Sequence, residues 1–114
     1  MVEHLVGLQA QTPRSPYLAL WSRIAGFDPM GLSRALQRRR VVRIALMRST
    51  VHLVSAADAL LLRPLIEPVI MREITSATWR PQLAGVDVDL LREHARAILD
   101  AEPRTPKQLG LLLS

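Results

Sequence analysis

Residues 28–55, DPMGLSRALQRRRVVRIALMRSTVHLVS, contain the pattern that decides the fold. Asp28 is a good N-cap and Pro29 suits the first position of a helix, and apolar residues then recur at helical spacing. Beyond the arginine run, apolar residues alternate with other residues over 42–54. The pattern predicts a basic helix followed by a β-hairpin. Its turn is Arg48–Ser49, although these residues lack the Gly or Asn of the strongest hairpin turns.

A second helix is predicted directly before this stretch. Ser15 suits the N-cap and Pro16 the first position, and Gly26 marks the end. Four residues at positions i, i+3, i+4 and i+7 predict one buried stripe, with both aromatic residues in the core: Tyr17, Leu20, Trp21 and Ile24. Two helices joined by a short turn that contains Gly, with the charge on the second helix, are typical of a helix-turn-helix with its recognition helix.

The segments on either side are also helical in pattern. Residues Glu3–Gln9 are apolar near helical spacing and predict the end of a helix. After the hairpin, Ser55 with Asp58 three residues later is typical of a capping box. The helix that this box starts extends to about Thr78, with kinks or breaks expected at its two prolines, Pro64 and Pro68.

Two more helices follow a connector over residues 80–86. Asp87 caps a helix that runs to Asp100, and its inward residues are predicted to be Val88, Leu91, Ala95, Ile98 and Leu99. A cap, a first-turn proline and a box partner then start the last helix, over 107–114: Thr105, Pro106 and Gln108. These two helices look like the opening of a second helix-turn-helix.

The predicted fold class is mainly α with a small β-hairpin: a winged helix-turn-helix followed by the helical start of a second winged helix. Residues 1–56 form the first winged helix, without its first helix, and residues 57–86 form a connecting helix and linker. Residues 87–114 are the truncated start of the second winged helix. We therefore expect the chain to be a fragment cut at both ends.

Composition excludes several classes of protein. The 114 residues are enough for one domain, and the 49% hydrophobic content is enough for a core. Because cysteine is absent, a disulfide scaffold, a thiolate metal site and a cysteine nucleophile are excluded. No apolar run is long enough to span a bilayer, and no signal peptide is recognisable. We expect a cytoplasmic, nucleoid-associated protein that is a monomer when full length, with no cofactor and no metal.

The net charge of +5 is concentrated in the first half of the chain. Residues 1–56 hold eight arginines and two acidic residues, whereas residues 57–114 hold seven basic and eight acidic residues. Double-stranded DNA is therefore the expected partner of the first half, contacted by Arg34, Arg38, Arg39, Arg40, Arg43, Arg48 and His52. A purely structural role stays open for two of these features, since an arginine run also suits a helix C-terminus and a lone strand histidine is more often structural.

Residues 7–56 contain four pieces in a specific order: LQAQ, PYLALWSRI, the LxxAL helix with its basic end, and the hairpin that ends in LMRSTVHLV. Together these pieces resemble the AlkZ-like DNA glycosylase family. The similarity continues more loosely through ADALLLRPLIEPV and LAGVDVDLLREHARAIL, so it covers most of the chain. The order and spacing of these pieces are more specific than any one of them.

The resemblance implies tandem winged helices followed by further β structure, and an enzyme that excises alkylated bases and unhooks crosslinks. The family's catalytic motif is Gln, an apolar residue, then Gln or Asp, and it maps onto Gln9, Ala10 and Gln11. Much of the family's DNA-binding surface lies outside these 114 residues, so we expect the isolated chain to be inactive.

A glutamine site suits only part of glycosylase chemistry. The amide cannot take a proton at neutral pH, but it can position water, which suffices when the leaving base is already cationic, as an N7-alkylated purine is. Two alternatives stay open: a noncatalytic, regulatory winged-helix DNA-binding protein, and a helical module whose arginine face binds an acidic protein. In both, Gln9 and Gln11 are ordinary solvated residues.

Overall fold

The computed structural model describes all 114 residues and confirms a mainly helical chain with a small antiparallel sheet. Contacts divide the chain into two units, Met1–Thr75 and Ser76–Ser114. The first unit contains β1 (Leu8–Gln9), α1 (Ser15–Trp21), α2 (Pro29–Gln37), β2 (Val41–Ala45), the 3-10 turn η1 (Met47–Ser49), β3 (Val51–Ser55) and α3 (Ala56–Ile74). The second contains the 3-10 turn η2 (Arg80–Leu83), α4 (Val88–Ala101) and α5 (Pro106–Leu112).

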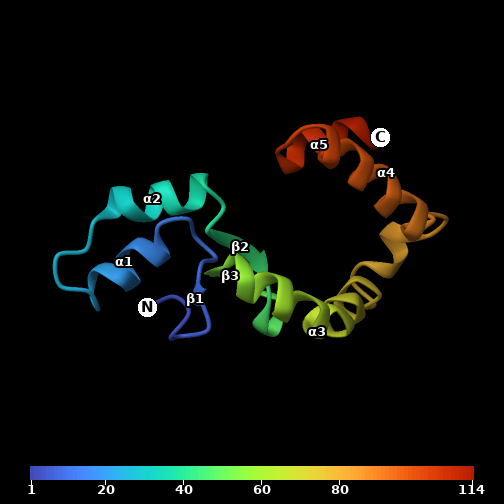
Figure 1. Ribbon diagram of the computed structural model, residues 1–114. Helices are drawn as coiled ribbons and strands as arrows, with labels where there is room; N and C mark the ends of the chain where they lie inside the picture. The colour runs from blue at the N-terminus through green and yellow to red at the C-terminus, as the bar shows by residue number, and fades with distance from the viewer. The chain divides into compact units, whose positions relative to one another are not determined.

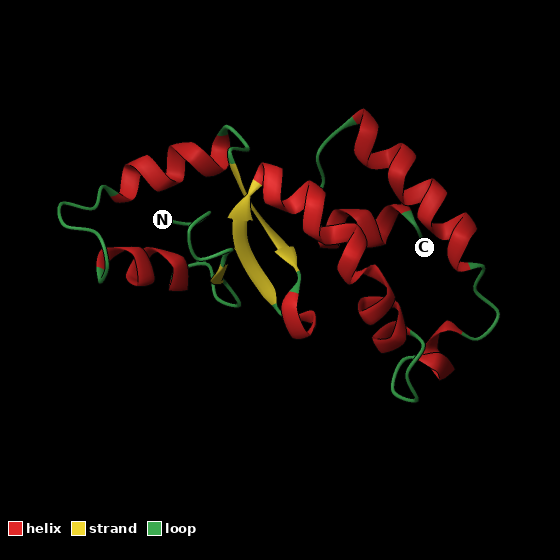
Figure 2. Ribbon diagram, turned by 60° about the horizontal axis from the view of Figure 1, so that its bottom comes forward, coloured by secondary structure: helices red, strands yellow, loops and turns green.

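The sheet of the first unit has three antiparallel strands in the order β1-β3-β2. One row of the register joins Leu8, Leu53 and Arg43, and the next joins Gln9, His52 and Ile44. Because successive side chains of a strand point to opposite faces, these two rows lie on opposite faces of the sheet. Helices α1 and α2 lie on one side of the sheet and the start of α3 on the other (Figure 1 and Figure 2).

The core lies between the sheet and the first two helices. Its buried members are Leu8, Ala10, Leu20, Leu32 and Leu53, with Tyr17, Ile24 and Phe27 among the half-buried residues packed against them. Full burial of one leucine side chain stabilises a fold by about 1.5–3 kcal/mol. Val54, on the other face of β3, is also completely buried. The central strand is thus covered on both faces and holds the unit together.

The two most local predictions are confirmed. Asp28 caps α2, because its Oδ1 accepts a hydrogen bond from the Met30 N–H at 2.9 Å. The hairpin turns at the predicted pair: Arg48 and Ser49 have φ values of 55° and 56°, and the Thr50 N–H donates to the Met47 carbonyl at 3.1 Å. Positive φ at both central residues is the feature of a type I′ hairpin turn.

The long helix α3 passes through both of its prolines, so no break interrupts it. A helical proline leaves the carbonyl four residues earlier without its N–H donor. At Pro64 and Pro68 these carbonyls belong to Leu60 and Pro64 itself, both exposed, so water can satisfy them. None of the helices has the length and apolar composition needed to cross a membrane.

The caps of the second unit are also where the sequence predicts them. Asp87 Oδ1 accepts hydrogen bonds from the N–H groups of Asp89 and Leu90 at the start of α4. Thr105 and Gln108 form both bonds of a capping box at the start of α5. Of the predicted inward residues of α4, all are half-buried except Leu99, which is 43% exposed.

The predicted helix at Glu3–Gln9 is wrong. A single helical turn closes with the Leu5 N–H on the Met1 carbonyl and ends at Gly7, where φ is +122°. Leu8 and Gln9 then form β1. Helical spacing of apolar residues could not reveal this strand, because its hydrogen-bond partners come from β3, more than forty positions later.

Two predictions about α1 are also wrong, and one about α3 is half correct. Trp21 is 69% exposed, because α1 ends at this residue after only seven residues and the side chain extends beyond the core. Arg14, not Ser15, is the N-cap residue, and the Ser15 hydroxyl pairs with Thr12. Ser55 accepts from the Asp58 N–H as predicted, but the reciprocal bond of the box is absent.

We predict that Gly7→Ala strongly destabilises the first unit. A Cβ at this position would lie 2.8 Å from Val54 Cγ1, in addition to the unfavourable φ. Because Val54 is completely buried and has no room to move, we expect a loss of about 2–3 kcal/mol in urea unfolding.

The matched control is Gly26→Ala. Gly26 also has a positive φ, but a Cβ there meets nothing within 4 Å, so only backbone strain of about 1 kcal/mol is expected. Equal losses for the two variants would contradict close packing of Gly7 on Val54.

Candidate functional site

Three hydrogen bonds fix the Gln9–Gln11 segment to the sheet. The Ala10 N–H donates to the Val51 carbonyl at 2.7 Å, and the Val51 N–H donates to Gln11 Oε1 at 3.1 Å. Arg43 Nη2 donates to the Ala10 carbonyl at 2.6 Å. The segment between β1 and α1 is therefore attached to both other strands.

The bond to Val51 fixes the orientation of the Gln11 amide. A backbone N–H can only donate, so the side-chain atom that faces it must be the carbonyl oxygen. The amide NH2 group of Gln11 therefore points away from β3, and the residue is exposed. Gln9 is exposed as well, two positions earlier, and residues two apart along an extended chain are separated by about 6.6 Å. Both predicted glutamines are thus accessible, and the side chain of Gln11 is held by a hydrogen bond to β3.

Arg43 acts across the sheet. It belongs to β2, an outer strand, while Ala10 follows β1, the other outer strand, so its side chain spans the central strand β3. The pattern Val41-Arg43-Ala45 places this arginine on the same face as the apolar core. The alternation of apolar residues along β2 is the sequence signal that could have indicated a partner for Arg43 within the protein. The sequence could not indicate which partner, because the contact joins residues 33 positions apart.

His52 is buried beside the glutamines. It is 9% exposed, and its Nδ1 lies 3.0 Å from the Thr50 carbonyl. Its register partner on β1 is Gln9. The side chain is therefore not on the open surface of the hairpin, where we expected a contact with DNA.

The remaining arginines differ in their partners. Arg34 forms a 2.7 Å ion pair with Asp28, and both side chains are about half exposed, so the pair contributes little to stability and can exchange for a phosphate. No ion pair engages the exposed residues Arg38, Arg39, Arg40 and Arg48. Arg48 occupies the hairpin turn, and the other three end α2, so the free guanidinium groups are attached at opposite ends of β2.

The end of α2 has an unusual residue in its turn. The Arg39 N–H bonds the Leu36 carbonyl and the Arg40 N–H bonds the Ala35 carbonyl, which together form a Schellman motif. This motif needs a left-handed residue, usually glycine, at the position that Arg39 occupies with φ 55°. Arg48 has the same φ. Two of the four free arginines are thus held in a conformation that costs about 1 kcal/mol or more.

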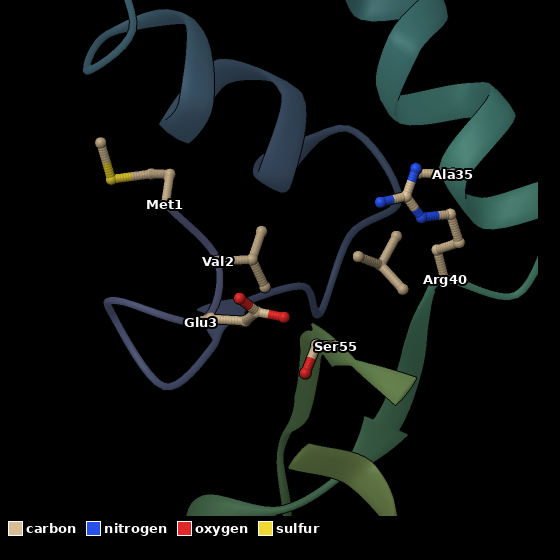
Figure 3. A pocket seen from close by; sticks show the side chains of 7 residues that line it. Met1, Val2, Glu3, Ala35, Arg40 and Ser55 are labelled. Atoms are coloured by element: carbon tan, nitrogen blue, oxygen red, sulfur yellow. The ribbon is translucent and has the colours of Figure 1, made fainter. Parts of the chain in front are cut away.

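A pocket of about 330 Å³ lies beside Arg40 (Figure 3). It is lined by Met1, Val2, Glu3, Ala35, Arg40, Val41 and Ser55. A second, apolar pocket of about 320 Å³ lies at the turn between α1 and α2, lined by Tyr17, Leu18, Trp21, Phe27 and Pro29. No three His, Asp or Glu side chains are grouped so that they could hold a metal ion.

We predict that Arg43→Ala loosens the Gln9–Gln11 segment. Loss of a half-buried, charge-assisted hydrogen bond costs about 1 kcal/mol, which corresponds to a fall in Tm of about 4–8 °C. The Ala10 N–H, which donates to the Val51 carbonyl, and the Val51 N–H, which donates to Gln11 Oε1, should exchange their hydrogens faster.

The control is Arg23→Ala, because Arg23 bonds only within its own segment, to Ala19 and Ser22. In the Arg23→Ala variant we expect the Ala10 amide hydrogen to exchange at the wild-type rate. Equal exchange in the Arg43 variant would show that its bond does not hold the segment.

Comparison of the sequence with known protein families gives a match. The family model described as DNA glycosylase AlkZ-like matches residues 2–114. Neither a curated protein nor a solved structure matches the chain. Because the family match covers nearly every residue, the chain belongs to the AlkZ-like DNA glycosylase family.

Proposed function

We propose that this protein is a DNA glycosylase for alkylated, cationic bases, in which Gln9 and Gln11 position the attacking water. The observation that carries the proposal is the rigid attachment of the Gln9–Gln11 segment to β3 and to Arg43, in a chain of a glycosylase family. The Gln11 amide, fixed by the Val51 N–H, and the exposed Gln9 amide two positions earlier are a suitable holder for one water molecule, because a fixed dipole costs no reorganisation during reaction.

The chemistry follows from the neutrality of the two amides. In an N7-alkylated purine the base is already positive, so the C1′–N9 bond breaks with both electrons moving to the base, which leaves neutral. The sugar becomes oxocarbenium-like, and the water oxygen forms the new bond to C1′. The water proton goes to solvent, since a glutamine cannot accept it at neutral pH.

The free arginines supply the duplex contact in this proposal. Arg38–Arg40 and Arg48 carry guanidinium groups without protein partners, and guanidinium groups suit forked contacts with phosphate. The strain at Arg39 supports a functional side chain there, because glycine would fit the turn without that cost. Base excision also requires the target nucleotide to leave the stack, and contacts on both of its flanks would hold it out.

We predict that Arg39→Gly makes the protein more stable but weakens its binding to DNA. Glycine removes the backbone strain, which raises the free energy of unfolding by about 1 kcal/mol. The lost phosphate contact lowers duplex affinity at every sequence and reduces the slope of log K against log salt by about one.

Urea unfolding and fluorescence anisotropy over a range of KCl concentrations measure the two effects. Arg72→Ala, which removes the same charge from the last turn of α3, is the control and should leave the salt slope unchanged. An unchanged slope for Arg39→Gly would remove Arg39 from the proposed interface.

We predict that in the full-length protein Gln9→Ala and Gln11→Ala each lower the release of 7-methylguanine from a methylated duplex by about 100-fold, because each removes one amide dipole from the water. Duplex affinity should be unchanged. Gln37→Ala, at the exposed end of α2, is the matched control and should release base at the wild-type rate.

If the double variant Gln9→Ala, Gln11→Ala keeps the wild-type rate, the glutamines are not the site. If the full-length protein binds the duplex with a steep salt dependence and releases no damaged base, the noncatalytic DNA-binding function replaces the glycosylase. Absence of salt-dependent duplex binding would favour an acidic protein as the partner instead.

A further inference from the structure

The buried ring of His52 has one nitrogen engaged and one nitrogen available. Nδ1 lies 3.0 Å from the Thr50 carbonyl, and a carbonyl can only accept, so Nδ1 carries the hydrogen. In the neutral ring Nε2 is then a hydrogen-bond acceptor. Nε2 has no partner in the protein, and it is not among the buried side-chain atoms sealed from solvent, since Asp58 Oδ2 is the one such atom without a partner. The free acceptor therefore keeps some access to solvent.

Gln9 lies opposite this ring. Because the Ala10 N–H bonds the Val51 carbonyl, the neighbouring Gln9–His52 pair is of the non-hydrogen-bonded kind, in which facing side chains come closest. Gln9 has two amide N–H donors and no partner of its own. The backbone of Gly7 covers the adjacent part of this face, where an added Cβ would lie 3.9 Å from the His52 Cβ. The most direct neighbour for the imidazole on the β1 side is thus the Gln9 side chain.

We propose that His52 is a positioning residue for Gln9: Nε2 accepts a hydrogen bond from the Gln9 amide and turns Gln9 Oε1 toward the attacking water. This inference rests on the proposed function of Gln9. Consecutive residues of β3 would then orient both glutamines, Val51 through its backbone N–H and His52 through its ring.

The two amides would present opposite groups to the water. The NH2 group of Gln11 donates to one lone pair of the water, and Gln9 Oε1 accepts one of its hydrogens. The second lone pair is then free to form the bond to C1′, and the proton that leaves the water passes to solvent. A buried histidine that only supported the fold would have no effect on this geometry.

Two substitutions separate the role of Nε2 from that of Nδ1. His52→Gln places its amide where Nε2 lies and retains an acceptor for Gln9. His52→Asn places its amide where Nδ1 lies, so it keeps the bond to Thr50 but loses that acceptor. In the full-length protein we expect His52→Asn to slow release of 7-methylguanine by about 100-fold, the cost of a misplaced reacting group, and His52→Gln to stay within a few-fold of wild type.

Two controls identify a merely structural role. Both variants should bind the methylated duplex as tightly as the wild type, and the rates should not follow Tm. In a Gln9→Ala background, His52→Asn should cause no further loss, because a positioning residue acts only through its target. A wild-type rate for His52→Asn, a greater loss for His52→Gln than for His52→Asn, or additive losses with Gln9→Ala would each overturn the proposal.

A measurement without turnover distinguishes failure of this proposal from failure of the proposed function. The side-chain NH2 resonances of Gln9 in ¹⁵N-labelled protein should shift in His52→Asn and stay in place in His52→Gln, with Gln37 as the internal reference. Shifted Gln9 resonances in a protein that releases no base would support the contact and reject the glycosylase. Unmoved resonances in an active protein would reject the contact alone.

Discussion

The pairing of β1 with β3 is the constraint on which the site depends. A strand of two residues contributes little to stability by itself. The pairing is therefore stabilised by the residues of this segment that pack into the core. Leu8 and Ala10 enter the core on one face, at 7% and 0% exposure, while Gln9 and Gln11 remain accessible. The apolar residue between the two glutamines is therefore a strand position that faces the core. Folding of the core and rigidity of the Gln9–Gln11 backbone depend on the same contact.

This alternation also explains why the middle residue is small. Ala10 is completely buried, its N–H is bonded to Val51 and its carbonyl to Arg43. Both backbone groups are engaged, and the side chain packs among Leu8, Leu20, Leu32 and Leu53. A larger side chain would have to displace one of these leucines, and overpacking of a close-packed core typically costs about 1–3 kcal/mol. Any shift of Ala10 would move both neighbouring glutamines.

Local and distant contacts explain which features the sequence could predict. Asp28, the hairpin turn and the cap at Thr105 depend on residues within four positions of one another, so pattern and turn chemistry located them. The strand β1 depends on residues more than forty positions away, and helical spacing concealed it. The prediction that Trp21 is buried is wrong for a related reason. The apolar stripe from Tyr17 to Ile24 requires a longer helix than the one that forms.

The site shows the same division between local and distant information. The resemblance gave Gln9 and Gln11 as a motif, but not the strand geometry that holds them. The prediction that Arg43 and His52 contact DNA rests on their residue types and on their place in the predicted hairpin. The structure bonds Arg43 to the Ala10 carbonyl and places His52 opposite Gln9, because strand order brings residues 43 and 52 to the same short segment. Only the pairing of three strands could supply that information.

The faces of the sheet separate charge from the amides. Arg43 shares a register row with Leu8 and Leu53, whereas Gln9 and His52 belong to the next row and point to the opposite face. A guanidinium beside the reacting sugar would oppose the positive charge that develops there, with a strength that rises as water is excluded. In the proposed reaction that charge moves from base to sugar and its total does not change. A site lined by neutral amides, in which the nearby guanidinium of Arg43 is engaged by the Ala10 carbonyl, needs only to accommodate that movement and to hold the water in place.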